Sequence, residues 1–328
     1  MSEPSILLIG GTGQLGGRIA RLIRKRHPLL KIVISARRLE RAHDLADEVG
    51  NADVVAVDLE RPDLGLAERS FSLAVPAFKD HAHAVAAWAL DRAVPYIAVS
   101  EAAFELAPLI ALFAHTPGAT LAIGAHTHGG LPSLIALALS RRFEAVESIH
   151  LGVVFDPSDP LPPGSLEDID RITKVGPPPL ILSKQRWQWL VEGSAASVIR
   201  PGSAPVPAEA VGLTDVLGLA GASRAASVRV DMGEGPVTKT FGTPGHEVVI
   251  RIVGRQHGRE IEQAWTLHDP EGNVAFGSKG IVLLVERLLG LNGDEPIKPG
   301  LYVPETLIAA DDALAALDSF GLRLIAHD

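Results

Sequence analysis

The chain has 328 residues, of which 47% are hydrophobic, and this length and composition predict a large core divided between about two domains. Its 30 Lys and Arg residues against 39 Asp and Glu residues give a net charge of −9. Because it has no basic tract, we expect no nucleic-acid partner. The absence of cysteine excludes disulfides, thiolate metal sites and cysteine nucleophiles. The apolar stretches are too short to span a bilayer and the first residues lack a basic leader, so we expect a cytoplasmic protein without membrane contact.

A glycine-rich turn follows the first predicted strand. Residues 6–9 are a continuous apolar run, typical of a strand buried on both faces of a parallel sheet. Glycines with G-x-G-x-x-G spacing come next, and apolar residues then recur at helical intervals. We assign the tight turn to Gly11, the approach of the backbone to a pyrophosphate to Gly13, and close helix packing to Gly16. The alternative is that these glycines form a turn with a structural role only. The predicted cofactor-binding residues of this turn are Gly10, Gly11, Thr12, Gly13, Gln14, Leu15 and Gly16.

The residues after the second predicted strand bear on the choice of cofactor. Residues 31–35 predict this strand, and a ribose-binding residue is expected at its end. An NAD-specific site places Asp or Glu there, whereas this chain has Ser35, Ala36, Arg37 and Arg38. Two guanidinium groups suit the 2′-phosphate of NADP. Arginines that only solvate a helix start are the alternative, but cations there oppose the helix dipole. We therefore predict NADP as the cofactor.

Four more strands are predicted before residue 126, and helical patterns separate them. They are residues 52–59, 71–75, 95–99 and 119–125. Asp58, near the end of the first, is expected at the adenine, and Pro76 directly follows the second, so both join the predicted cofactor contacts. The regular alternation of strand and helix predicts an α/β fold, a doubly wound parallel sheet of Rossmann type over residues 1–125.

The second half of the chain has another pattern. Prolines are frequent between residues 153 and 207, and two alternating stretches, 245–254 and 258–267, predict paired antiparallel strands with one buried face. We expect an α+β domain with a mixed sheet over residues 126–295. Its roles would be substrate binding and dimerisation, which makes the protein a homodimer.

Several longer stretches of the N-terminal half carry a family resemblance. They are GGTGQLGGRIARLI at 10–23, SARRLERAHDLA at 35–46, residues 72–101 and LAIGAHTHGGLPSLIA at 121–136. Together they resemble the saccharopine dehydrogenase-like oxidoreductases. The chain departs from the family at Ala98, where members have an acidic residue, and in the histidines of its glycine-proline loop. Residues 299–308 are similar to a late stretch of the family, which implies that residues 296–328 return to the nucleotide-binding domain.

The resemblance implies hydride transfer between NADP(H) and a carbon bonded to nitrogen. The substrate would be a small molecule derived from an amino acid, such as its conjugate with a keto acid. Two alternatives stay open: an NADP-dependent reductase of a C=O or C=C bond, because the fold fixes the cofactor and not the substrate, and a non-catalytic NADP sensor. The Tyr-x-x-x-Lys mechanism is excluded, because neither Tyr96 nor Tyr302 has a lysine four residues later.

Three residues are predicted to be catalytic. His126 and His128 follow the strand at 119–125, at the sheet edge where ligands of such folds bind, and imidazole suits acid–base chemistry. Lys79 follows the fourth strand and is expected to bind a substrate carboxylate. The alternatives are that the histidines orient the next helix and that Lys79 lies at a solvated helix start. Two histidines do not define a metal site, so none is expected.

One aromatic stretch remains. Residues 186–189 read Arg-Trp-Gln-Trp, and tryptophans at this spacing are typical of a core or an interface rather than of catalysis.

Overall fold

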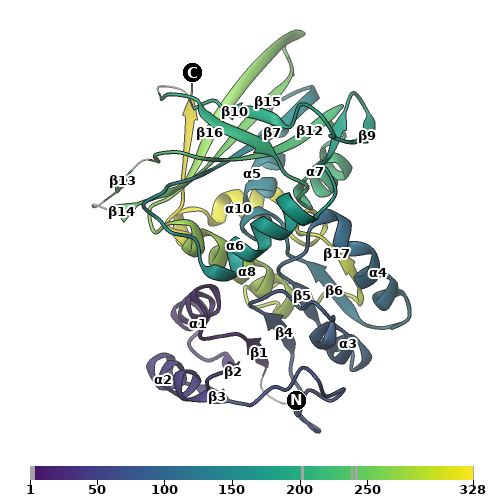
Figure 1. The fold of residues 1–328 in the computed structure, drawn as a ribbon, viewed down its shortest axis with the longest axis vertical. Coiled ribbons are helices and arrows are strands. Elements are labelled where there is room, and N and C mark those ends of the chain that lie inside the picture. Colours follow the sequence, from purple (N-terminus) through teal and green to yellow (C-terminus); the bar gives the residue numbers. More distant parts are fainter. Residues whose placement is uncertain (1–3, 201–202, 238, 241–242, 328) are drawn as a thin grey trace. The chain divides into compact units, whose positions relative to one another are not determined.

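The computed structural model describes residues 4–200, 203–237, 239–240 and 243–327 (Figure 1). The chain forms two compact units. Unit 1 comprises Met1–Glu101, Glu105–Ala125 and Gly277–Leu307. Unit 2 comprises Ala102–Phe104, His126–Phe276 and Ile308–Asp328.

Unit 1 is built on a seven-stranded sheet in the order β17-β6-β5-β4-β1-β2-β3, and every neighbouring pair is parallel. The strands are β1 (Ser5–Ile9), β2 (Lys31–Ser35), β3 (Ala52–Val54), β4 (Leu73–Pro76), β5 (Tyr96–Ala98), β6 (Thr120–Ile123) and β17 (Gly300–Tyr302). The helices are α1 (Gln14–Arg26), α2 (Leu39–Val49), α3 (Ala84–Asp91), α4 (Leu106–Ala114), most of α8 (Asn273–Leu289) and α9 (Pro304–Leu307). Ile6, Leu7 and Leu8 of β1 are fully buried, as a central strand covered on both faces requires.

Unit 2 is built on a nine-stranded mixed sheet. Its main order is β10-β11-β12-β7-β15-β16-β18, and β8 joins β12 and carries β9. Among the strands of this sheet that the structure describes, only β7 and β12 pair in parallel. The strands are β7 (Ala145–Phe155), β8 (Leu180–Ser183), β9 (Arg186–Trp189), β10 (Ala195–Val198), β11 (Val206–Ala210), β12 (Ser227–Glu234), β15 (His246–Gln256), β16 (Arg259–Asp269) and β18 (Arg323–His327), with a separate pair, β13 (Lys239–Thr240) and β14 (Thr243–Pro244). The helices are α5 (Leu131–Ser140), α6 (Pro163–Asp170), α7 (Asp215–Ser223) and α10 (Ala310–Ala316), with short helical turns η1 (Ala103–Glu105), η2 (Thr127–Gly130), η3 (Arg171–Val175) and η4 (Asp318–Phe320).

The predicted fold class is confirmed: a parallel Rossmann-type sheet and a second, mixed sheet are both present. The C-terminal part is divided differently from the prediction. β17 pairs with β6 in unit 1, but β18 pairs with β16 in unit 2. Most of α8 belongs to unit 1 because its apolar side chains pack at the end of β6, where a methyl group on Gly124 would lie 2.8 Å from Leu284 Cδ1.

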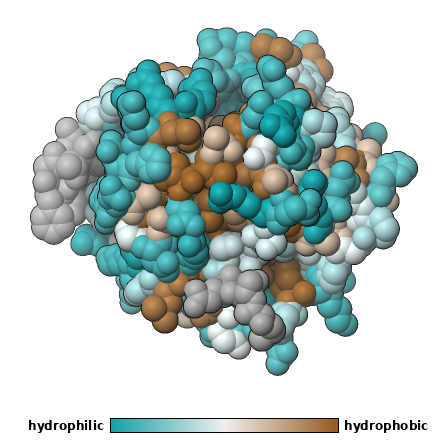
Figure 2. Space-filling model, turned by 90° about the horizontal axis from the view of Figure 1, so that it is seen from below, coloured by the Kyte–Doolittle hydropathy of each residue, from teal (hydrophilic) through white to brown (hydrophobic). Residues whose placement is uncertain are grey.

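The surface mixes polar and apolar side chains. Figure 2 shows one face, on which apolar residues gather near the centre and hydrophilic residues surround them. No helix in the described part of the chain is long and apolar enough to cross a membrane.

A buried carboxylate ties α8 to the end of α1. Glu286 is 1% exposed and accepts hydrogen bonds from Arg26 Nε at 2.5 Å and, on the same oxygen, from His27 Nε2 at 2.7 Å. Burial by itself raises the pKa of the Glu286 carboxyl, but these hydrogen bonds outweigh it and hold the pKa below its usual value. The ionised form is therefore the one that stabilises the fold.

Glu286→Gln is expected to lower the free energy of unfolding by about 1–3 kcal/mol at neutral pH, because Arg26 and His27 lose an ionised acceptor. A lowered folded-state pKa contributes stability above the unfolded-state value of about 4.3, and this stability is lost as the pH falls through the folded-state value. Urea unfolding of both proteins should thus show a difference that shrinks toward acid pH. A difference that is independent of pH would contradict this account.

Candidate functional site

The glycine turn between β1 and α1 is shaped by three close approaches. The N–H groups of Gly10 and Gly11 both donate to the Ser35 carbonyl, at 2.8 and 3.0 Å. A Cβ on Gly11 would lie 2.7 Å from Ile34 Cγ2, and one on Gly16 would collide with the Gly10 carbonyl and lie 2.7 Å from Gly11 Cα. The positive φ of the turn, 76°, is at Gly10, so Gly10 and not Gly11 makes the tight turn. Gly11 is instead constrained by the neighbouring strand.

The N-terminus of α1 lies open beside this turn. Gly13 is the N-cap, no side chain caps the helix, and its first turn has no acidic residue. A Cβ on Gly13 would have only the Gly10 carbonyl within 4 Å, at 3.3 Å. Gln14 is exposed, and Thr12 and Leu15 are half-buried. Unpaired helix N–H groups and the positive end of the helix dipole therefore face open space, which fits a pyrophosphate.

Two arginines follow the carbonyl that holds the turn. Ser35 is buried at the end of β2, and Arg37 and Arg38 come directly after it, both exposed. Neither guanidinium has a hydrogen bond or ion pair with another residue in the part of the chain that the structure describes. Exposed, unpaired guanidinium groups that follow the residue holding the glycine turn suit a second phosphate group.

The other two predicted cofactor residues lie on neighbouring strands. Pro76 ends β4 in register with Ile9, and the next residue, Ala77, donates its N–H to the Ile9 carbonyl at 2.8 Å. Asp58 lies further out than the strand prediction implied, because β3 ends at Val54. It is exposed, and its carboxylate accepts the N–H of Glu60 at 3.0 Å.

Lys79 lies in a buried charge cluster. Its side chain is 9% exposed, and its ammonium pairs with Glu101 and, at 3.3 Å, with Glu105. The next residue, Asp80, accepts the first N–H groups of α3, among them those of Ala84 and Val85 at 2.9 Å. Lys79 is therefore held in place and largely neutralised. No local pattern indicates this ion pair, because Glu101 lies 22 positions from Lys79.

In unit 2, one buried carboxylate holds the turn that carries the predicted histidines. Asp215 is fully buried and accepts the N–H and hydroxyl of Thr127, at 2.7 and 3.1 Å, and the hydroxyl of Ser133, at 2.6 Å. His126, itself buried, precedes Thr127, and His128 follows it. Sequence reasoning missed Asp215, whose partners lie more than 80 positions away.

The environment of His128 fixes its chemistry. Its Nε2 lies 3.0 Å from Asn273 Oδ1, so Nε2 carries the hydrogen. Its ring stacks on Phe276 at a centroid distance of 4.4 Å and lies 4.5 Å from His246. Nδ1 is buried and has no hydrogen-bond partner among the described residues. Burial lowers the pKa of His128 to about 4. The ring is therefore neutral at physiological pH, with a free lone pair on Nδ1.

Two further buried histidines, His246 and His268, were not predicted, and the ring of His246 lies 4.5 Å from that of His128. Burial, followed by the nearby His128 and His268 rings, lowers the pKa of His246 well below its ordinary value. Within the described residues, no group of three His, Cys, Asp or Glu side chains is arranged to hold a metal ion.

Comparison with known proteins supports the fold. No protein-family model and no curated protein matches the sequence. The saccharopine dehydrogenase (L-Glu forming) of Saccharomyces cerevisiae has a TM-score of 0.65 at 14% identity, over 99% of both chains. A probable dehydrogenase from Thermotoga maritima has a TM-score of 0.52 at 11% identity, over 98% of both. An oxidoreductase from Agrobacterium radiobacter, in complex with NAD+, L-tartaric acid and magnesium, has a TM-score of 0.50 at 14% identity, over 98% of this chain and 97% of that one. The predicted resemblance is thus confirmed as one of fold: the chain has a parallel Rossmann-type sheet and a second, mixed sheet, the fold that saccharopine dehydrogenase also has.

Proposed function

We propose that this protein is an NADP-dependent oxidoreductase that transfers hydride at a C–N bond of an amino-acid-derived substrate. One observation carries the proposal: an uncapped helix N-terminus at a glycine turn, with two unpaired arginines next to the carbonyl that holds the turn. The uncapped helix N-terminus would bind the pyrophosphate, and the two arginines would bind the 2′-phosphate of NADP. We also propose that the protein acts as a homodimer.

Different residues of unit 1 would bind different parts of the dinucleotide. The turn from Gly10 to Gly16 would hold the pyrophosphate, and Ser35, Arg37 and Arg38 the ribose and its 2′-phosphate. Asp58 would lie at the adenine, and Pro76 would line the site at the end of β4. When bound, the nicotinamide supplies or accepts the hydride, and the protein positions the substrate and moves protons.

His128 is the proposed acid–base residue. The lone pair on its buried Nδ1 would take the proton that leaves the substrate nitrogen when the C–N bond is oxidised, which requires that the bound substrate reach this atom. Asn273 keeps the hydrogen on Nε2 and so orients the ring. His126 lies in the same turn and is proposed to assist. Lys79 is already paired with two carboxylates, which favours a positioning role over direct binding of a substrate carboxylate.

A turnover screen tests the proposal. NADPH is mixed with the protein and with three substrate panels: amino acids paired with keto acids, ketones and aldehydes, and activated alkenes. Consumption of NADPH in the first panel alone is the expected result. Consumption in the second or third would replace the proposal with a C=O or C=C reductase. NADPH binding without consumption in any panel would make the protein a sensor.

His128→Gln is expected to reduce kcat/KM by about 10²–10⁴-fold, the usual contribution of a general base, while the affinity for NADPH stays unchanged. His115→Gln, an exposed position, is the control and should have no effect. The wild-type pH profile is diagnostic. The base acts when deprotonated, so activity should stay level through neutral pH and fall only as the pH approaches about 4. A fall in activity centred on the ordinary histidine pKa of about 6.5 would contradict this assignment.

A further inference from the structure

Strand β9 is an open edge of the unit 2 sheet. It pairs with β8 alone, through a two-residue turn in which Lys184 and Gln185 have φ of 48° and 64°. In such a hairpin the residues that flank the turn form a hydrogen-bonded pair, and bonded and non-bonded pairs then alternate. Gln188 therefore bonds to β8, whereas the N–H groups of Trp187 and Trp189 face away from it. These donors are available to another strand.

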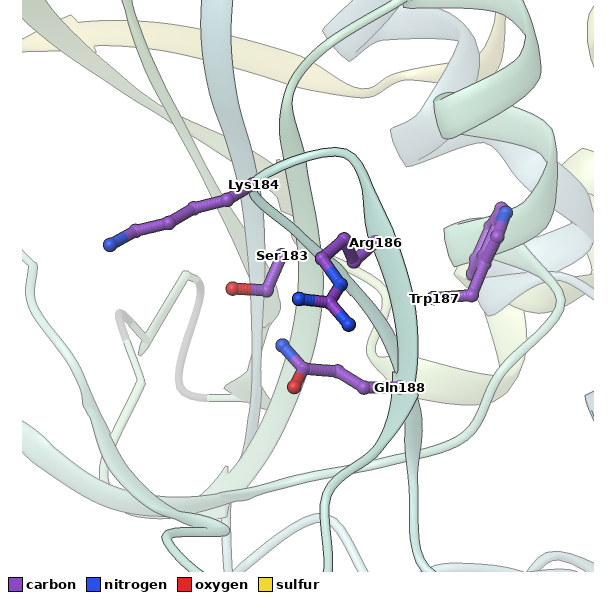
Figure 3. Close-up of a pocket in the computed structure, with 5 residues that line it drawn as sticks. All are labelled: Ser183, Lys184, Arg186, Trp187 and Gln188. Carbon is purple, nitrogen blue, oxygen red and sulfur yellow. The ribbon is translucent and has the colours of Figure 1, made fainter.

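The side chains of β9 separate by face. Trp187 and Trp189 are 49% and 48% exposed. Figure 3 shows Trp187 on one side of the hairpin and Arg186 and Gln188 on the other. All three, with Ser183 and Lys184, line a shallow pocket of about 350 Å³. Two half-exposed indoles on one open edge are unusual for a surface that meets only water.

The ends of this edge carry opposite charges. Lys184 and Arg186 lie at the turn and Glu192 lies beyond the other end, and all three are exposed. None of them forms an ion pair with any residue that the structure describes. An antiparallel pairing of two such edges brings the cationic end of one against the anionic end of the other.

We propose that β9 pairs with β9 of a second copy of this chain around a two-fold axis at Gln188. In this register Trp187 lies opposite the partner's Trp189, and the turn end of each strand, with Lys184, lies toward the end of the other strand that leads to Glu192. The interface is isologous, as expected for a homodimer. It rests on the homodimeric part of the proposed function and not on the activity.

The four indoles set the strength of this contact. Half of each indole is already buried, so their remaining surface is roughly 400 Å² in total. This area alone is well below the roughly 1,200 Å² at which stable specific interfaces begin, so it corresponds to a weak contact. We therefore expect a dimer that dissociates on dilution, and sedimentation velocity should be run over a range of protein concentrations.

Disulfide trapping tests the register directly, because the chain has no cysteine of its own. At the two-fold axis the two Gln188 residues form a non-hydrogen-bonded pair, with Cα atoms about 4.5 Å apart, within the range of about 4.4–6.8 Å that a disulfide needs. Gln188→Cys should therefore oxidise to a covalent dimer. Arg186→Cys is the matched control: its two copies would be four residues apart, roughly 13 Å, and should not cross-link.

Sedimentation of charge variants gives a second, independent test. Lys184→Glu should weaken the dimer at least tenfold, and the double variant Lys184→Glu/Glu192→Lys should restore it, which a purely local effect on folding would not do. A wild-type protein that is monomeric at every concentration would overturn the inference together with the homodimer. A dimer that Gln188→Cys does not trap, and that Lys184→Glu does not weaken, would overturn this interface and leave the homodimer in place.

Discussion

Gly16→Ala is expected to abolish dinucleotide binding and to destabilise unit 1. A Cβ at this position would meet the Gly10 carbonyl and Gly11 Cα, both backbone atoms that cannot turn aside. The helix must then move away from the turn, which costs about 1–3 kcal/mol and shifts the N–H groups that would hold the pyrophosphate. We expect at least a hundredfold loss of NADPH affinity in a fluorescence titration, together with a lower midpoint of urea unfolding.

Gly17→Ala is the matched control, one residue further along the same helix. Its Cβ would meet Arg21 Nη1 at 3.0 Å, the end of a flexible side chain, and the next atom is 3.6 Å away. Because alanine is the better helix former by about 1 kcal/mol, this variant should be as stable as the wild type or more so, and should bind NADPH normally. Equal effects of the two substitutions would show that general crowding of α1, and not the contact with the turn, is responsible.

Asp215→Ala is the second substitution with a large expected effect. It removes the acceptor of three buried hydrogen bonds and leaves the N–H of Thr127 and two hydroxyl groups without it. Unsatisfied buried donors and the new cavity together should cost about 3–5 kcal/mol of unfolding free energy. Because η2 contains His128 and directly follows His126, turnover should fall even under conditions where the variant remains folded.

Asp215→Asn separates hydrogen bonding from charge. The amide oxygen can accept from Thr127, and its NH₂ can donate to the Ser133 hydroxyl, so we expect a loss of only about 1 kcal/mol. Chemical denaturation of the three proteins measures both effects. If the asparagine variant is as unstable as the alanine variant, the negative charge itself is required and the hydrogen-bond account is wrong.

Local patterns predicted the parts of the fold that depend on neighbours in sequence. The strand β1, the glycine turn and the helix α1 together span 22 residues, from Ser5 to Arg26, so all three could be predicted from local patterns. The position of the residue with positive φ could not be predicted in this way. It is Gly10, and the N–H groups of Gly10 and Gly11 both donate to the Ser35 carbonyl on β2, 25 positions from Gly10.

The site depends more on distant residues than the fold does. Lys79 reads as a free cation in the sequence, and only the folded chain brings Glu101 to it. His128 reads as an ordinary histidine, and its low pKa comes from burial against Phe276 and His246. Alternation along β9 was equally consistent with a core strand, because the pattern does not reveal that the strand lies at a sheet edge.

The central claim is that the glycine turn and the two arginines bind NADP. A titration of NADPH and of NADH, followed by nicotinamide fluorescence, should be made on the wild type, on Arg37→Ala/Arg38→Ala and on Lys25→Ala/Arg69→Ala. The last removes two exposed cations of unit 1 from other segments. We predict that the wild type prefers NADPH, that the arginine pair is needed for this preference, and that the control keeps it. If the wild type binds neither dinucleotide, the account is contradicted, since the glycine turn would then have only a structural role.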